Sequence, residues 1–541
     1  MNNWGFGYYD RKNDRIEPFY NDPEQPDCRM TNAVVRFDVH DNVLWLSTYN
    51  ERGLRKAVLL QQPADVLTLD AKSSNPLSGE IRALMTDRRG RMWVGTRDGE
   101  LTAFDASNRP VYTLPQQGAG TGMIYALRED AEGRIWVGTK GEGLYRLTPK
   151  GTDDYAVTHF THSDAEAYSL SDDQIYCVEI DTRGRIWVAT YGGGINLLED
   201  PAGSRFIHAG NQLSHYPLDE AGRVRWLLCD GAERMFAATV DGLLLFDPSL
   251  PPREMRFRLM QKIPGDTTSL GNNDIIHMLK DSKGRIWLAT FGGGLNLITG
   301  YDSVGLPHFH CYDRSYGLAS NICMALTEDR RGDIWVSTHN AVSRFDPSRH
   351  LFSNYYVYDE HRNEIFSEAT ALTSPLGDVY FAGGRQLYRF SPGEMLSEKI
   401  DYRLRFTGFD VRNKPARVGK DAPLEVAVPE AGRVVLPYNF SNFRVEFATL
   451  NFSIQHEVGY MYRLEGYDQD WNISGTINRA SYSNVPIGKY RFHVKAFVGN
   501  ADTADEGISI EIEVLPPLWL TWWAKTLYVL AVLAVLVIAF R

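Results

Sequence analysis

Residues 175–198 read Ile175-Tyr-Cys-Val-Glu-Ile-Asp-Thr-Arg-Gly-Arg-Ile-Trp187-Val-Ala-Thr-Tyr-Gly-Gly-Gly-Ile-Asn-Leu-Leu198. Two apolar runs, 175–180 and 185–190, have the length and composition of strands. The Asp-Thr-Arg-Gly run between them predicts a tight hairpin, because aspartate bonds its own backbone and glycine adopts a positive φ. The three glycines after Tyr191 predict a second turn into a third strand. This stretch is therefore a small antiparallel unit with a tryptophan on its middle strand.

The same unit recurs along the chain. The position of Trp187 is filled by Trp93, Trp136, Trp287 and Trp335 in strong copies, and by Trp45, Phe236 and Tyr380 in weaker ones. The spacing runs from 43 residues (93 to 136) to 51 residues (136 to 187). A period of about 48 residues built from short strands is typical of a β-propeller. We interpret the tryptophans as buried wedges between sheets, and the recurring aspartates as turn formers.

The pattern Trp-Val-Gly-Thr-x-x-Gly-Gly-Leu, preceded by Ser-Leu-Ser/Gly-x-Asn/Asp-x-Ile, resembles the two-component regulator propeller repeat over about residues 30–392. The resemblance implies two seven-bladed propellers in the periplasmic part of a sensor. Because eight anchors cannot supply fourteen blades, we predict one seven-bladed propeller over 62–392, after the remnant of a preceding one over 1–61. Trp4-Gly-Phe-Gly-Tyr-Tyr-Asp10 matches a third strand, so the chain is expected to begin in mid-blade. An eight-bladed ring is the alternative.

Beyond Pro392 the repeat stops. Residues 400–515 contain longer alternating strands, such as residues 508–514, and predict an immunoglobulin-like β-sandwich. The motifs around Tyr462, Tyr482 and Tyr490 resemble the three-tyrosine domain of the same sensors. We interpret these tyrosines as packing and hydrogen-bonding residues. The resemblance also implies a homodimer formed through this sandwich.

The end of the chain is apolar. The 22 residues from Trp519 to Phe540 carry one charge, Lys525, and a membrane helix needs about 20 residues. Tryptophans and Tyr528 supply an interfacial aromatic belt. We predict a transmembrane helix over 518–541 in the inner (cytoplasmic) membrane, with the β domains in the periplasm. The N-terminus has no secretory signal pattern, and no kinase follows the helix, so we expect a fragment cut at both ends.

Composition excludes several functions. Lys+Arg number 57 against 68 Asp+Glu, a net charge of −11 without basic runs, which argues against direct nucleic-acid contact. Five cysteines with no Cys-x-x-Cys pair indicate neither a zinc site nor a disulfide framework. Nucleophile-elbow, zinc-protease and phosphate-loop motifs are missing from the sequence. We therefore expect no enzyme activity, no cofactor and no metal site.

Candidate ligand residues follow from the direction of the chain. The Thr-x-x-Gly-Gly turns and the links into the innermost strands share one face, where propeller loops converge on the central channel. An aromatic ring at this face could stack on a sugar, while Asn, Asp and Arg side chains bond its hydroxyls. The candidates on this face are Tyr191, Phe291, Arg225, Asn273, Asp173 and His339, with Asp172, Arg223, Asn272 and Asn321 as further members.

Together these features predict the carbohydrate-sensing part of a two-component sensor. It would recognise an oligosaccharide and signal through the membrane helix to a kinase that starts a phosphorelay and is absent from this chain. One alternative is a membrane-tethered propeller enzyme, a lyase or hydrolase, acting on glycans. Another is a structural adaptor that binds only protein. The ligand site lies either in this propeller or in the missing one.

Overall fold

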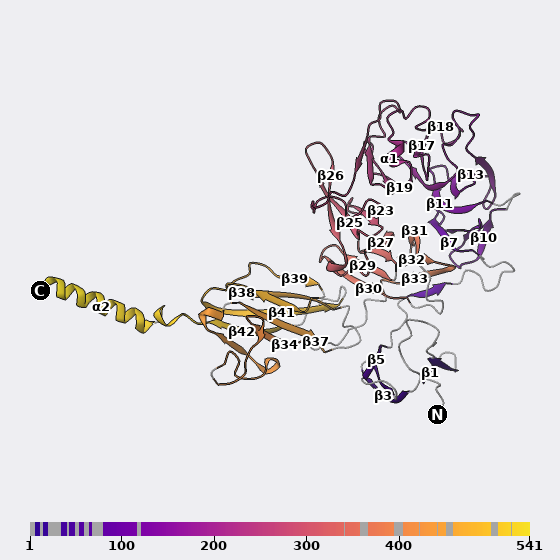
Figure 1. Cartoon of the computed structure of the whole chain (residues 1–541). Coiled ribbons are helices and arrows are strands. Elements are labelled where there is room, and N and C mark those ends of the chain that lie inside the picture. The colour runs from indigo at the N-terminus through magenta and orange to yellow at the C-terminus, as the bar shows by residue number, and fades with distance from the viewer. Residues whose placement is uncertain are drawn as a thin grey trace. The chain divides into compact units, whose positions relative to one another are not determined.

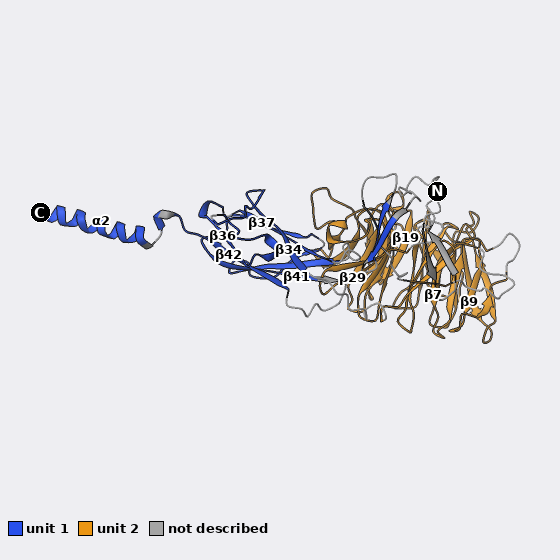
Figure 2. Cartoon of the chain, turned by 90° about the horizontal axis from the view of Figure 1, so that it is seen from below, with its two compact units in different colours: residues 1–61, 399–541 blue, residues 62–398 orange. Residues whose placement is uncertain are grey.

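The computed structural model describes residues 6–10, 15–19, 34–40, 43–48, 54–58, 64–67, 79–115, 121–339, 341–357, 366–393, 404–420, 422–440, 442–450, 458–475, 477–498, 507–520 and 522–541 (Figure 1). Trp4 and Cys28 lie outside these residues. The chain divides into two units. They comprise residues 62–398, and residues 1–61 with 399–541 (Figure 2).

Within its described residues, the unit 62–398 consists of seven four-stranded antiparallel sheets, here called blades one to seven. In each of the first six blades the strands follow chain order from the innermost outward. Blades one to three are β7 (Ile81–Thr86), β8 (Met92–Thr96), β9 (Leu101–Phe104) and β10 (Pro110–Thr113); β11 (Met123–Glu129), β12 (Ile135–Lys140), β13 (Leu144–Pro149) and β14 (Tyr155–Phe160); and β15 (Ile175–Ile180), β16 (Ile186–Thr190), β17 (Ile195–Leu198) and β18 (Phe206–Ile207).

Blades four to six continue the pattern, with the short helix α1 (Leu218–Ala221) before blade four and the 3-10 turn η1 (Arg314–Tyr316) before blade six. Their strands are β19 (Val224–Cys229), β20 (Met235–Thr239), β21 (Leu243–Phe246) and β22 (Phe257–Met260); β23 (Ile275–Lys280), β24 (Ile286–Thr290), β25 (Leu295–Tyr301) and β26 (Pro307–Tyr312); and β27 (Cys323–Glu328), β28 (Ile334–Thr338), β29 (Val342–Asp346) and β30 (Leu351–Tyr355).

Blade seven combines strands from both ends of the unit: β31 (Phe366–Thr373), β32 (Val379–Gly383), β33 (Gln386–Phe390) and, as its outer strand, β6 (Asp65–Leu67). Its innermost strand lies directly beside blade one. The Ser367 hydroxyl donates to the Ile81 carbonyl at 2.7 Å, and the Ile81 amide donates to the Gly384 carbonyl at 2.8 Å. These bonds close the ring at seven blades, so the β-propeller prediction is confirmed and the eight-bladed alternative is wrong.

A buried carboxylate holds the hairpin of most blades. Asp181 Oδ1 accepts the amides of Arg183 and Arg185, and its Oδ2 accepts Arg185 Nε at 2.7 Å and the Trp187 indole N–H at 2.9 Å. All five repeat tryptophans are fully buried. The interpretation of wedges and turn formers is confirmed, and the structure adds the bond that joins them. It measures 2.9 Å in each of the pairs Trp93–Asp87, Trp136–Asp130, Trp187–Asp181, Trp287–Asp281 and Trp335–Asp329.

The other unit begins with two small antiparallel sheets. They are β1 (Phe6–Asp10) with β2 (Arg15–Phe19), and β3 (Val34–His40), β4 (Val43–Thr48) and β5 (Leu54–Val58). That these strands are remnant blades of a preceding propeller stays a prediction.

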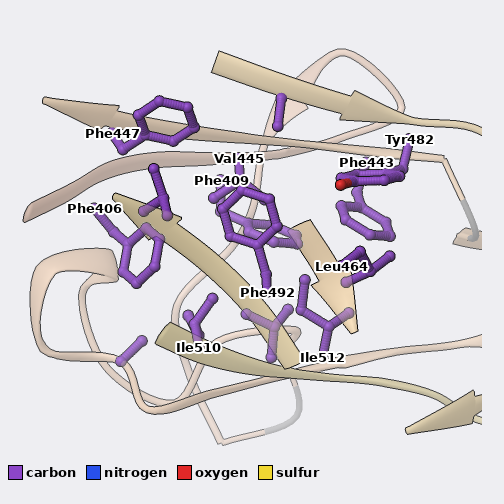
Figure 3. Packing of buried hydrophobic residues seen from close by; sticks show 14 of the residues in the cluster. Phe406, Phe409, Phe443, Val445, Phe447, Leu464, Tyr482, Phe492, Ile510 and Ile512 are labelled. Atoms are coloured by element: carbon purple, nitrogen blue, oxygen red, sulfur yellow. The ribbon is translucent and has the colours of Figure 1, made fainter. Parts of the chain in front are cut away.

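Two further sheets in this unit form a sandwich. The first holds β34 (Leu404–Val411), β35 (Lys414–Pro415), β37 (Phe443–Thr449) and β40 (Arg479–Tyr482). The second holds β36 (Arg433–Leu436), β38 (Val458–Glu465), β39 (Asn472–Gly475), β41 (Gly488–Val498) and β42 (Ile508–Val514), with 3-10 turns η2 (Val428–Glu430) and η3 (Tyr438–Phe440) on either side of β36. Alternate residues of the strands fill one core, in which Phe447, Phe492 and Ile512 are fully buried (Figure 3).

The three tyrosines serve this core. The Tyr482 hydroxyl donates to Asp468 Oδ2 at 2.6 Å, and the same oxygen accepts the Leu464 amide at 2.7 Å. The Tyr490 hydroxyl donates to the Pro486 carbonyl at 3.0 Å. The Tyr462 ring packs beside Tyr482, with ring centroids 6.2 Å apart. Their interpretation as packing and hydrogen-bonding residues is confirmed.

The chain ends in α2 (Trp522–Phe540), preceded by the 3-10 turn η4 (Leu518–Leu520). Among the described residues, one helix is long and apolar enough to cross a membrane. Its candidate span is Trp523–Phe540, with a mean hydropathy of 2.2, and it is almost entirely exposed within the chain. The helix starts at Trp522, four residues later than the predicted range of 518–541, because the 3-10 turn η4 takes up residues 518–520.

The buried carboxylate generates a pH-dependent prediction. Burial alone would raise the pKa of Asp281, but hydrogen bonds from Trp287 and Arg285 lower it below its ordinary value. The stabilisation by the ionised carboxylate is therefore present above that ordinary value and is lost as the pH falls through the lowered one. Asp281→Asn should cost about 2 kcal/mol at neutral pH, and urea unfolding should show this loss shrinking below pH 4.

Asp200→Asn is the matched control, since among the described residues the Asp200 carboxylate accepts only the Ala202 amide, in an exposed turn. Equal losses for the two variants, or a loss for Asp281→Asn that does not change with pH, would contradict the role assigned to the buried carboxylate.

Candidate functional site

The innermost strand of each blade carries a register shift near its start. A bulge frees one residue from the strand ladder and re-aims its side chain. In blade seven the shift is wider, from Phe366 to Ala371, and includes Glu368. We call these seven residues the channel ring: Arg82, Tyr125, Tyr176, Arg225, Ile276, Met324 and Glu368.

Arg225 lies at the centre of the charged part of this ring. Its guanidinium is 3.0 Å from a Glu368 oxygen and 3.0 Å from an Asp274 oxygen, and its side chain is 14% exposed. Blade four and blade seven are not neighbours, so the pair between Arg225 and Glu368 crosses the central channel. Burial opposes the charge, but the two carboxylates raise the pKa of Arg225 above its ordinary value. Burial raises the pKa of Asp274 in spite of the guanidinium.

Aromatic rings form the wall beside this ion pair. Tyr176 stacks on Tyr191 with ring centroids 4.7 Å apart, and Arg225 lies 5.6 Å from the Tyr191 ring. Tyr176 also packs against Tyr125 at 4.9 Å, with the Lys140 ammonium 5.6 Å from the Tyr176 ring. Burial raises the pKa of Tyr176 to about 12, so its phenol stays protonated at neutral pH. The predicted platform Tyr191 is thus stacked within the protein.

A cavity of about 840 Å³ is lined in part by three members of the channel ring, Arg82, Met324 and Glu368. It lies on the face that carries the turns and the links into the innermost strands. Blades one, five, six and seven line it, through residues that include Glu80, Arg82, Arg97, Asp98, Phe291, Met324, His339, Glu368 and Arg385.

The charges in this cavity are only partly paired. Glu80 contacts Arg82 at 3.0 Å and Arg97 at 3.2 Å. Asp98 and Arg385 make no ion pair or side-chain hydrogen bond with any residue that the structure describes. Phe291 is 47% exposed. The cavity therefore offers a hydrogen-bond acceptor, a cationic donor and an open aromatic face.

The structure separates the six sequence candidates into two groups. Phe291 and His339 line the cavity. Arg225 contacts the cavity residue Glu368, and Tyr191 packs against Arg225.

Asp173 and Asn273 instead bond the backbone of their own loops. Asp173 Oδ1 accepts the His162 amide and Asn273 Oδ1 accepts the Lys262 amide, each at 2.6 Å. Asn321 does the same for Arg314 at 2.9 Å. Each bond fastens the end of one blade's outer strand to the link into the next blade. We therefore leave Asp173 and Asn273 out of the proposed site.

Six residues that line the cavity were not predicted from the sequence: Glu80, Arg82, Arg97, Asp98, Glu368 and Arg385. A signal for two of them exists in the repeat. The position eleven residues before the wedge gives Arg82 (from Trp93) and Met324 (from Trp335), and the position four after it gives Arg97, Phe291 and His339. Glu368 was hidden because the wider bulge of blade seven shifts it from its repeat position.

Removing Arg225 should test the cross-channel pair. Arg225→Met leaves two half-buried carboxylates without their cation, so we expect a loss of about 3 kcal/mol in the free energy of unfolding. Arg225→Lys should recover part of it. The control is Arg223→Met on the same strand edge, where the partner Asp241 and the arginine are both exposed and little change is expected. Urea unfolding measures all three, and similar values for Arg225→Met and Arg223→Met would refute the assignment.

Comparison with known proteins agrees with this architecture. The profile of the two-component regulator propeller matches residues 75–98, 118–141, 169–192, 269–292 and 317–340. These are the five blades that carry a tryptophan wedge. The profile of the Y_Y_Y domain matches residues 451–515.

Individual relatives are distant. Histidine kinase P4 of Formosa agariphila is 24% identical over 383 residues, which cover 66% of this chain and 26% of that protein. Two similar solved structures are extracellular domains of putative hybrid two component systems from B. thetaiotaomicron. BT3049 is 18% identical with a TM-score of 0.27, over 95% of this chain and 89% of its own. BT4673 is 17% identical with a TM-score of 0.24, over 95% of this chain and 84% of its own.

The two profiles confirm the resemblance that the sequence motifs predicted. The chain therefore carries two-component regulator propeller repeats followed by a Y_Y_Y domain.

Proposed function

We propose that this chain is the ligand-sensing part of a membrane-anchored two-component sensor and that it binds an oligosaccharide in the cavity beside the channel ring. The observation that carries the proposal is the combination of Asp98, Arg385 and Phe291 around one cavity. A sugar hydroxyl can donate to the carboxylate and accept from the guanidinium, while the apolar face of the sugar covers the exposed ring.

The size of the cavity supports this class of ligand. Its volume of about 840 Å³ is within the range of small-molecule sites. His339 adds a further polar group at the rim, and Glu368 adds a carboxylate that Arg225 already holds in place. Of the three carboxylates that line the cavity, Glu80 and Glu368 are paired with arginines and only Asp98 is left. Because a glycoside hydrolase uses a pair of carboxyl groups, this disfavours the alternative of a glycan hydrolase.

The position of the chain in the cell follows from the same proposal. The propeller and the sandwich would lie in the periplasm, and α2 would cross the inner membrane. The Y_Y_Y domain would form a homodimer. A conformational change caused by ligand binding would pass through this domain and α2 to a kinase. The sequence resemblance and the candidate span at Trp523–Phe540 support this arrangement.

A thermal-shift screen tests the ligand class. The full chain in detergent micelles should be heated with cello-, xylo-, malto-, laminari- and galacturono-oligosaccharides. Because a ligand that binds only the native state stabilises it, at least one glycan should raise the melting temperature by several degrees. Phe291→Ala and Asp98→Asn should each abolish that shift without lowering the melting temperature of the free protein.

Tyr316→Ala is the matched control, since Tyr316 is also exposed but lies outside the cavity. A shift that survives Phe291→Ala and Asp98→Asn would place the glycan elsewhere. Chromatographic detection of glycan cleavage would favour the enzyme instead.

A further inference from the structure

One end of the sandwich carries a group of large apolar side chains that remain exposed. At this end β36 and β42 finish side by side, with Leu436 opposite Val514 and the Leu515 amide donating to the Leu436 carbonyl at 2.8 Å. β41 begins there, since Gly488 pairs with Val514. We call the exposed apolar residues at this end the sandwich base: Tyr438, Tyr467, Ile487, Leu515, Trp519 and Leu520.

Two members of the sandwich base are in contact although they are far apart in sequence. The rings of Tyr438, on the turn η3, and Trp519, on the turn η4, meet edge to face with centroids 5.2 Å apart. Both stay open, at 42% and 52% exposure. The turn after β36 is thereby held against the segment that leads into α2.

The chain continues from this contact into the candidate membrane span. α2 begins at Trp522, three residues after Trp519, and the span begins at Trp523. Tryptophan and tyrosine side chains favour the boundary between headgroups and hydrocarbon, where the ring is sheltered and its polar atom stays hydrated. If α2 spans a bilayer, Trp519 is at that boundary, and Tyr438 is at the same depth because the two rings touch.

We propose that the sandwich base is a lipid-contacting surface, and that Tyr438 inserts into the interfacial layer of the bilayer that α2 spans. This inference rests on the membrane span of the proposed function and extends it to the folded domain. A cluster of exposed apolar side chains is costly in water and is stabilised when a bilayer surface covers it. The sandwich would then meet the membrane through its own turns as well as through the helix.

Site-specific photo-crosslinking tests this surface in the full chain. p-Benzoylphenylalanine replaces Tyr438, Ile487, Leu450 or Trp523, one at a time, in nanodiscs of phosphatidylethanolamine and phosphatidylglycerol. Leu450 is the matched control: it is 46% exposed but follows Thr449, which pairs with Leu404 at the opposite end of the sandwich. Trp523 reports on the span itself.

After irradiation, mass spectrometry should find lipid adducts at 438 and 487 several-fold above those at 450. Lipid adducts at 523 with none at 438 would overturn the inference while leaving the membrane helix intact. A covalent dimer at 438 in place of a lipid adduct would also overturn it, since a second chain would then cover the surface. Failure to label lipid at 523 would refute the membrane span and the inference with it.

Discussion

The propeller depends on a hydrogen bond from a buried indole to a buried carboxylate. A tryptophan wedged between two sheets fills the space that separates them, but its N–H must find a partner away from water. The hairpin aspartate supplies that partner and closes its own turn with its other oxygen. In blade four, Phe236 brings no such donor. Asp230 keeps the ion pair with Arg234 that its counterparts in other blades make, and Lys280 is its further partner in place of an indole. In the five blades with a tryptophan, the wedge and the hairpin turn therefore stabilise each other through this bond.

This regularity determines where the site can be. Because the first six blades repeat the same strand geometry, the residue at the bulge of the innermost strand and the residue just after the wedge strand approach the channel in each of them. The wider bulge of blade seven brings Glu368 there. Most copies fill these positions with neutral or apolar side chains, such as Ile276 and Val240. Charged residues occur where the copies differ: Arg82, Arg225 and Glu368 at the bulge, and Arg97 and Lys140 after the wedge strand. The cavity lies beside these departures from the repeat.

Structural elements that depend on residues close together in the sequence could be predicted. Hairpins, wedges, alternating strands and the apolar helix each follow from residues a few positions apart, so the propeller, the sandwich and the helix could be predicted. The site was predicted only in part. Asp173 resembles a ligand residue, yet a loop amide eleven positions away uses its oxygen. The pair between Arg225 and Glu368 joins residues 143 positions apart in the sequence. A pattern of neighbouring residues cannot predict a contact between residues so far apart.

The outer strand of blade seven has a consequence for how the molecule is made. β6 pairs with β33 through three residue pairs, and Arg389 forms an ion pair with Asp65, 324 positions earlier in the chain. A ribosome must therefore synthesise nearly the whole propeller before the last blade can be completed. Until then the partial ring exposes the edges of its terminal sheets, and pairing so distant in sequence forms slowly. Keeping those edges apart during synthesis is a task for molecular chaperones.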